Sequence, residues 1–126
     1  MRIAIGIGIT ILVIMLGGVG SIGYLERTAA DIASQLNEIQ RAVQVEDWEQ
    51  AQQQVATLFE QWNKVADLWS AIINHREVDE IRMAFHRARE YVTNEDKASA
   101  LAELAVAKFL VVHVPEKEKP TLSNIF

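Results

Sequence analysis

An uncharged stretch from Ile3 to Leu25 constrains this chain more than any other feature. Its 23 residues lie between Arg2 and Glu26. A helix of that length rises about 34 Å, slightly more than the ~30 Å hydrocarbon core of a bilayer. The sequence therefore predicts a transmembrane anchor over residues 1–25.

The few charges beside this run predict its orientation. Arg2 precedes the run, whereas Glu26 and Arg27 cancel one another after it. The positive-inside bias then favours a single-pass cell-membrane protein with a cytoplasmic amino terminus and an extracytoplasmic domain. A cleaved signal peptide is the alternative, since Ser21-Ile22-Gly23 offers small residues to a peptidase. The run exceeds the usual apolar length of about 7–15 residues in signal peptides, which favours an uncleaved anchor.

All six glycines of the chain lie in this segment. Small residues let transmembrane helices approach one another closely, and small-xxx-small pairs occur at Ala4/Gly8 and Gly17/Ser21. Gly17 and Ser21 are therefore candidates for a helix contact in the membrane. The alternative is a glycine-rich anchor that does not pair.

Composition narrows the classes of function. The net charge of −5 includes Arg2, the one charged side chain before Glu26, so the rest of the chain carries −6. An acidic domain is a poor partner for nucleic acid, which is bound through clustered Lys and Arg. The absence of cysteine excludes disulfides, thiolate zinc sites and cysteine nucleophiles.

Beyond the span, apolar residues recur in steps of three and four, which is typical of amphipathic helices. The first stripe begins at Leu25, and no Gly or Pro interrupts residues 24–45, so we expect the span to run directly into it. Asp47 is a plausible N-cap for the second helix, and Asn74 is one for the third. The fourth follows residues 93–96, and we expect Pro115 to end it. The apolar stripe predicted for that last helix includes Leu101, Leu104, Ala105, Val111 and Val112.

These stripes predict an all-α protein, in which an N-terminal transmembrane helix precedes an up-and-down antiparallel bundle of four helices over residues 26–114. Residues 115–126 form a C-terminal tail. In the alternative, the second and third helices are fused, because no Gly or Pro marks a break near Asn74. The large residues predicted for the core are Trp48, Trp62, Trp69, Ile81, Phe85 and Leu104.

Residues 49 positions apart resemble one another. Glu46-Asp47 matches Glu95-Asp96, and Ala51 matches Ala100. Because 49 is a multiple of seven, two heptad patterns in phase would produce most of the apolar matches without any duplication. We interpret the correspondence as two similar helical hairpins.

The densest polar cluster begins at His75. A metal or anion site could be built from His75, Asp79 and His86. The alternative is a capped helix with a salt-bridged face, in which Glu90 neutralises Arg87 and His86. We favour this alternative, because the spacing fixes no third ligand, and we expect no cofactor.

No motif indicates catalysis. Glycine is absent outside the span, so the sequence offers no phosphate-binding loop and no nucleophile elbow. No Glu-x-x-His pair supports a di-iron site, and the spacing of Ser, His and Asp does not indicate a triad. We therefore expect a protein that is not an enzyme.

Several separated features carry a resemblance to a known family. They are the N-terminal span, Trp62 and Trp69, His75-x-Glu77-x-Asp79, Glu103-Leu104 with His113, and Asn124-Ile125-Phe126. Together they resemble the short single-span bacterial proteins called domain of unknown function 4363, which are associated with endospore-forming Gram-positive bacteria. The resemblance implies no particular activity. It implies that the tail docks on the bundle, so that deleting Leu122 to Phe126 would lower the melting temperature.

Two functions remain as hypotheses. The first is a membrane-anchored, non-enzymatic module that binds a membrane protein or a second copy of itself at the outer face of the membrane, with a role in sporulation suggested by the family. The second is an extracytoplasmic bundle that senses a ligand or metal and acts through a membrane partner.

Overall fold

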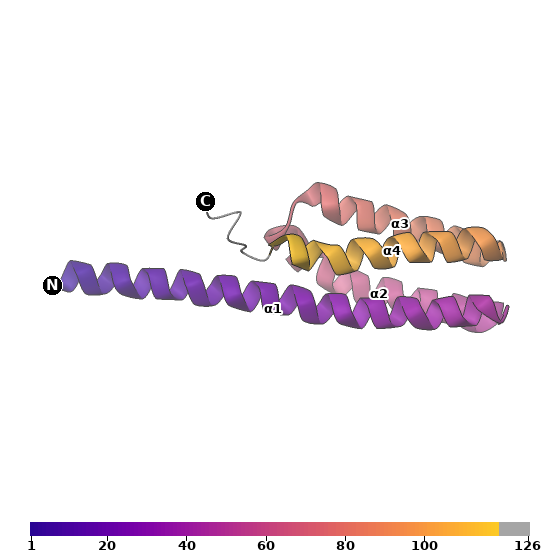
Figure 1. Cartoon of the computed structure of the whole chain (residues 1–126), viewed down its shortest axis with the longest axis horizontal. Helices are drawn as coiled ribbons and strands as arrows, with labels where there is room; N and C mark the ends of the chain where they lie inside the picture. Colours follow the sequence, from indigo (N-terminus) through magenta and orange to yellow (C-terminus); the bar gives the residue numbers. More distant parts are fainter. Residues whose placement is uncertain (119–126) are drawn as a thin grey trace.

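Four helices make up residues 1–118, the part of the chain that the computed structural model describes (Figure 1). They are α1 (Arg2–Gln44), α2 (Trp48–Ile72), α3 (His75–Thr93) and α4 (Lys97–Glu118). The predicted all-α fold is confirmed. The fused alternative is wrong, because Ile73 is extended and the Asn74 side chain caps a separate α3.

Helix α1 continues from the predicted span into the bundle without a break, as expected from the sequence. Its 43 residues rise about 65 Å, and its N-terminal half extends beyond the other three helices (Figure 1). Residues 1–20 are exposed, whereas Leu25 is completely buried in the bundle. Packing thus begins inside the apolar run, a few residues before the predicted boundary at residue 25.

The remaining half of α1 packs with α2, α3 and α4 around one core. Each helix contacts its neighbour along the chain, and α1 also contacts α4, which closes the ring. An aromatic cluster fills the centre, where the Trp62 ring meets Trp69 at 5.5 Å and Phe85 at 5.2 Å between centroids, both edge to face. Such pairs stabilise a core by about 0.5–1.5 kcal/mol beyond the burial of their area.

Polar contacts join α2 to α1 beside this cluster. The Trp69 indole N–H donates to the Thr28 hydroxyl at 2.9 Å, and that hydroxyl donates to the Tyr24 carbonyl. The amides of Gln35 and Gln61 also contact one another. Because the indole N–H of Trp69 has a partner, the complete burial of this large ring leaves no donor unsatisfied there.

A tight turn joins α1 to α2. Glu46 has φ 59°, in the left-handed region, and its N–H donates to the Val43 carbonyl at 3.0 Å. The Asp47 N–H donates to the Ala42 carbonyl at 2.9 Å, which completes a Schellman motif. The Asp47 carboxylate then accepts from the Gln50 N–H and caps α2, as predicted.

The turn between α3 and α4 repeats this geometry 49 residues later. Glu95 has φ 57°, and the Asp96 N–H donates to the Tyr91 carbonyl at 2.9 Å. The Asp96 carboxylate accepts from the Ser99 N–H at 3.2 Å. The interpretation of two similar hairpins is therefore confirmed at the level of individual backbone bonds.

The two hairpins also share their core positions. Residues 49 apart are buried together along both helices of each hairpin. The buried pairs are Ala29/Val78, Ile32/Ile81, Leu36/Phe85, Ile39/Ala88, Val43/Val92, Ala51/Ala100, Val55/Leu104, Leu58/Ala107, Trp62/Val111 and Val65/Val114.

Two details of α4 differ from the prediction. Ala105 and Val112 are exposed, and the buried stripe contains Ala100, Ala107 and Val114 together with the predicted Leu104 and Val111. Apolar residues surround α4 almost completely, so their spacing could not define its inner face. Pro115 lies inside the helix, which continues to Glu118. A proline this close to the C-terminal end removes one backbone bond without stopping the last turn.

The predicted tail begins at residue 115, but α4 includes its first part. The predicted docking of Asn124-Ile125-Phe126 lies outside the described residues.

Candidate functional site

The three metal candidates on α3 do not form one site. Asp79 pairs with Arg82 at 3.5 Å, and the Nδ1 atom of His86 lies 3.0 Å from the Arg89 guanidinium. Within residues 1–118, no group of three or more His, Cys, Asp or Glu side chains is placed to hold a metal ion. His75 is the exposed first residue of α3.

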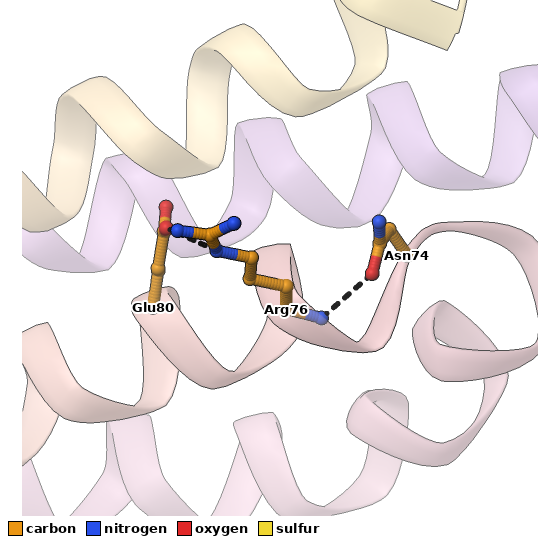
Figure 2. A network of polar contacts seen from close by, with 3 residues as sticks. All are labelled: Asn74, Arg76 and Glu80. Atoms are coloured by element: carbon orange, nitrogen blue, oxygen red, sulfur yellow. Dashed lines mark hydrogen bonds and ion pairs between the residues drawn. The ribbon is translucent and has the colours of Figure 1, made fainter.

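The start of α3 is instead a capped and solvated helix end (Figure 2). The Asn74 side chain accepts from the Arg76 N–H at 2.9 Å, and the Arg76 side chain reaches Glu80 at 3.8 Å. The Arg76 side chain is 86% exposed, so this ion pair contributes little to stability.

One predicted ion pair is wrong. Arg87 pairs with Glu103 of α4 at 3.0 Å, and not with Glu90. Arg87 faces the α3–α4 seam, where Glu103 is largely shielded from solvent, whereas Glu90 is exposed. This contact therefore joins the two helices of the second hairpin.

A shallow groove between α2 and α3 contains a positioned cation. The Arg89 guanidinium lies 4.3 Å above the centre of the Phe59 ring, a cation–π geometry. The groove has a volume of about 350 Å³, and Val55, Ala56 and Val92 form its apolar floor. The Arg89 guanidinium could bind an anionic group of a small ligand, and the apolar floor could contact a short apolar part of the same ligand.

The exposed half of α1 has two hydroxyl-bearing pairs on one face. Thr10 donates to the Gly6 carbonyl at 2.9 Å, and Ser21 donates to the Gly17 carbonyl at 2.8 Å. Eleven residues separate the pairs, which rotates the helix by only about 20° from one to the next. The sequence prediction found Gly17 and Ser21 but missed Gly6 and Thr10, although this spacing could have identified them.

The other predicted pair, Ala4/Gly8, lies elsewhere on the helix. Thirteen residues separate Ala4 from Gly17, which places them about 140° apart around the axis. A Cβ atom added at Gly8 or Gly17 would meet nothing within 4 Å. Packing within the described chain therefore does not require glycine at either position.

The outward face of α4 is apolar along most of its length. Phe109 is 59% exposed, Val106 is 43% exposed and Val112 is 37% exposed. The Phe109 ring stacks on His113 at 3.9 Å between centroids. We name this surface the α4 strip, and it consists of Ala98, Ala102, Ala105, Val106, Phe109 and Val112.

The matching surface of the first hairpin is polar. Forty-nine residues before each member of the α4 strip, α2 carries Glu49, Gln53, Ala56, Thr57, Glu60 and Asn63, all exposed. The two helices thus occupy the same place in their hairpins but present different chemistry outward. An exposed apolar patch beside a polar surface is typical of an interaction site.

The core candidates lie where the sequence suggested, with one difference. Trp62, Trp69, Ile81, Phe85 and Leu104 are each at most 1% exposed. Trp48 is only half-buried, because it is the first residue of α2, directly after the turn at one end of the bundle.

Two helices of the described chain, α1 and α4, are long and apolar enough to cross a membrane by length and composition. The apolar part of α1 is not buried at all within the structure, whereas a third of the corresponding part of α4 is buried in the bundle. These features define a helical-bundle protein with a candidate N-terminal membrane span.

The chain belongs to the family described as domain of unknown function (DUF4363), which it matches over residues 19–125. No match was found among curated proteins or among solved structures. The predicted resemblance to this family is therefore confirmed, and the match begins near the end of the exposed apolar run and includes the bundle.

Proposed function

We propose that this protein is a membrane-anchored, non-enzymatic interaction module. In this proposal, α1 crosses the cytoplasmic membrane with its amino terminus inside, and the bundle stands on the outer face. The α4 strip binds a membrane protein partner there. A role in sporulation is the setting suggested by the family resemblance.

The α4 strip is the observation that carries the proposal. Within residues 1–118, Phe109 and its neighbours stay exposed, and binding of a partner would exclude them from water. Burying a phenylalanine side chain stabilises a complex by about 1.5–3 kcal/mol. Because the strip is long and narrow, it suits an apolar helix of the partner laid along α4.

The anchor supports this placement. Residues 3–20 are exposed and uncharged, and they rise about 27 Å, close to the thickness of the hydrocarbon core. Packing of the bundle starts directly after them. The bundle is therefore held close to the membrane surface, where a membrane protein can reach it.

Affinity purification of the full chain from native membranes tests the proposal. We expect proteins enriched with the wild type to fall about tenfold or more with Phe109→Glu, since a charge replaces the central apolar contact. Met83→Glu is the matched control, because Met83 is equally exposed (57%) but lies on α3. Equal loss with both variants, or no loss with Phe109→Glu, contradicts the proposal.

The span supports a second contact within the membrane, through the face that carries Gly6, Thr10, Gly17 and Ser21. Gly17→Leu should weaken a partnership made there while the bundle stays folded. Gly8→Leu is the control on a different face, and the structure has open space at both glycines. Equal effects of the two substitutions would indicate a general effect on membrane insertion.

The α2–α3 groove favours the second hypothesis, a ligand-sensing bundle. Arg89 would bind the anionic group of a ligand while Phe59 holds the guanidinium in place. Thermal shift of the full chain in detergent with a panel of small carboxylates, phosphate and divalent metals tests this role. A shift that Arg89→Ala abolishes supports it, and no shift across the panel contradicts it.

A further inference from the structure

The end of the bundle opposite the span carries a groove between α1 and α2 (Figure 1). Its volume is about 430 Å³, within the range of about 300–1,000 Å³ that is typical of small-molecule sites. The residues that line it combine an acid, a base, two amides and two apolar side chains. They are Glu38, Arg41, Ala42, Val45, Gln50 and Gln54. We name this surface the α1–α2 groove.

The size of one residue explains part of the opening. In the second hairpin, Tyr91 packs against the core. Its counterpart 49 residues earlier is Ala42, whose side chain ends at the Cβ atom. The first hairpin therefore leaves open a volume that a phenol ring occupies in the second.

A missing ion pair explains the rest of the opening. Arg87 and Glu103 join α3 to α4 at 3.0 Å. The equivalent residues of the first hairpin are Glu38 and Gln54, and no hydrogen bond joins them within residues 1–118. The side-chain oxygen of Gln54 is buried there without a hydrogen-bond partner. A buried acceptor without a donor destabilises a protein, so this oxygen favours a ligand that donates to it.

We propose that the α1–α2 groove binds a small zwitterion, a free α-amino acid with a short apolar side chain. The ammonium group of the ligand donates to the Gln54 oxygen and pairs with the Glu38 carboxylate. The ligand carboxylate pairs with the Arg41 guanidinium, and the ligand side chain contacts Ala42 and Val45. This inference does not depend on the α4 strip and goes beyond the proposed function.

The charges in the groove favour a zwitterion over an anion or a cation. Glu38 and Arg41 lie three residues apart on α1 and both line the groove, but no ion pair joins them within residues 1–118. Two such groups are complementary to a ligand that carries both signs close together. Glu38 would repel a simple anion, and Arg41 would repel a simple cation.

Thermal unfolding of the full chain in detergent tests the ligand class. We expect a dissociation constant on the order of 1 mM, because Glu38 and Arg41 are both exposed. About 20 mM L-valine should then raise the Tm by at least about 5 °C. Isovalerate lacks the ammonium group of valine and isobutylamine lacks its carboxylate, so each should raise the Tm by at most about 1 °C.

Three results would overturn the proposal at this stage. Isovalerate that matches L-valine would assign the binding to a simple anion, and isobutylamine that matches it would assign the binding to a simple cation. The third is the absence of a shift with all of L-alanine, L-valine and L-leucine.

Ala42→Tyr tests the position of the site. It gives the first hairpin the ring that Tyr91 supplies in the second, so it should fill the groove and abolish the shift with L-valine. A full shift in this variant overturns the proposal. If the variant does not unfold cooperatively, a second variant at the surface decides the question.

That second variant is Glu38→Arg with Gln54→Glu, which transfers the ion pair of the second hairpin to the first. It should close the groove and abolish the shift with L-valine. The matched control is Asp31→Arg with Gln53→Glu, which makes the same change in charge at exposed positions of α1 and α2 outside the groove. An unchanged shift in the first pair, or equal loss in both, overturns the proposal. Both pairs leave the α4 strip intact, so loss of amino-acid binding and loss of partner binding are separate results.

Discussion

The two hairpins of the bundle, α1–α2 and α3–α4, share one backbone plan but differ in what they present outward. Their turns use the same left-handed glutamate and the same capping aspartate. Most of their core positions match at an offset of 49. The shared features are those that a hairpin needs in order to fold.

Their differences lie outside the core. The first hairpin begins with an exposed apolar run, whereas the second begins with a capped, charged helix at Asn74. The outer face of α2 is polar, whereas that of α4 is apolar. Folding explains neither difference, because both hairpins pack without these residues. We infer that the span and the α4 strip are where function resides.

The largest losses of stability should come from substitutions at the core positions that the two hairpins share. Ile32 and Ile81 are equivalent and both completely buried. Ile32→Ala and Ile81→Ala should each lower the free energy of unfolding by about 2–5 kcal/mol, because each leaves a cavity in the same layer. Urea unfolding of the full chain in detergent, followed by the fluorescence of buried Trp62 and Trp69, measures both. If only one of the two substitutions lowered the free energy of unfolding, the two hairpins would not contribute equally to stability.

The capping aspartates should have an intermediate effect. Asp47→Ala and Asp96→Ala each remove the side-chain acceptor for a backbone N–H in the first turn of the next helix. Each should cost about 1 kcal/mol, within the usual range for N-caps. Asp→Asn at the same positions is the control and should be nearly neutral, since asparagine caps equally well.

Replacing the two glutamates that have positive φ should change stability the least, and it should raise stability where the other substitutions lower it. Glu46→Gly and Glu95→Gly should each stabilise the chain by about 0.5–1 kcal/mol, because glycine adopts φ near 60° without steric cost. The midpoint of urea unfolding should rise in both. A rise in only one would indicate that the glutamate side chain has a further contact in the other turn.

Much of the fold follows from the sequence. The spacing of apolar residues, three or four positions apart, predicted the first three helices of the bundle, and the repeated Glu-Asp pair predicted both turns. The register of α4 could not be obtained in this way, because a helix that is apolar on nearly every side has no periodic signal. The turn at Asp96 fixes its register instead.

The candidate site was harder to predict for the same reason. Two members of the α4 strip, Ala105 and Val112, were predicted to be buried, whereas the structure exposes both and buries Ala100 and Ala107. The pairing of Arg87 with Glu103 depends on contact between helices, which spacing along α3 does not reveal. In the span, the relation of Gly6/Thr10 to Gly17/Ser21 was present in the sequence as an eleven-residue spacing.

The most direct measurement compares photo-crosslinking from the two equivalent outer faces in native membranes. A crosslinking amino acid replaces Phe109 on the α4 strip in one chain and Glu60, its counterpart on α2, in another. We expect a discrete protein adduct from position 109 and none from position 60. Matching adducts from both positions, or an adduct from position 60 alone, would contradict a role for the α4 strip in binding a partner.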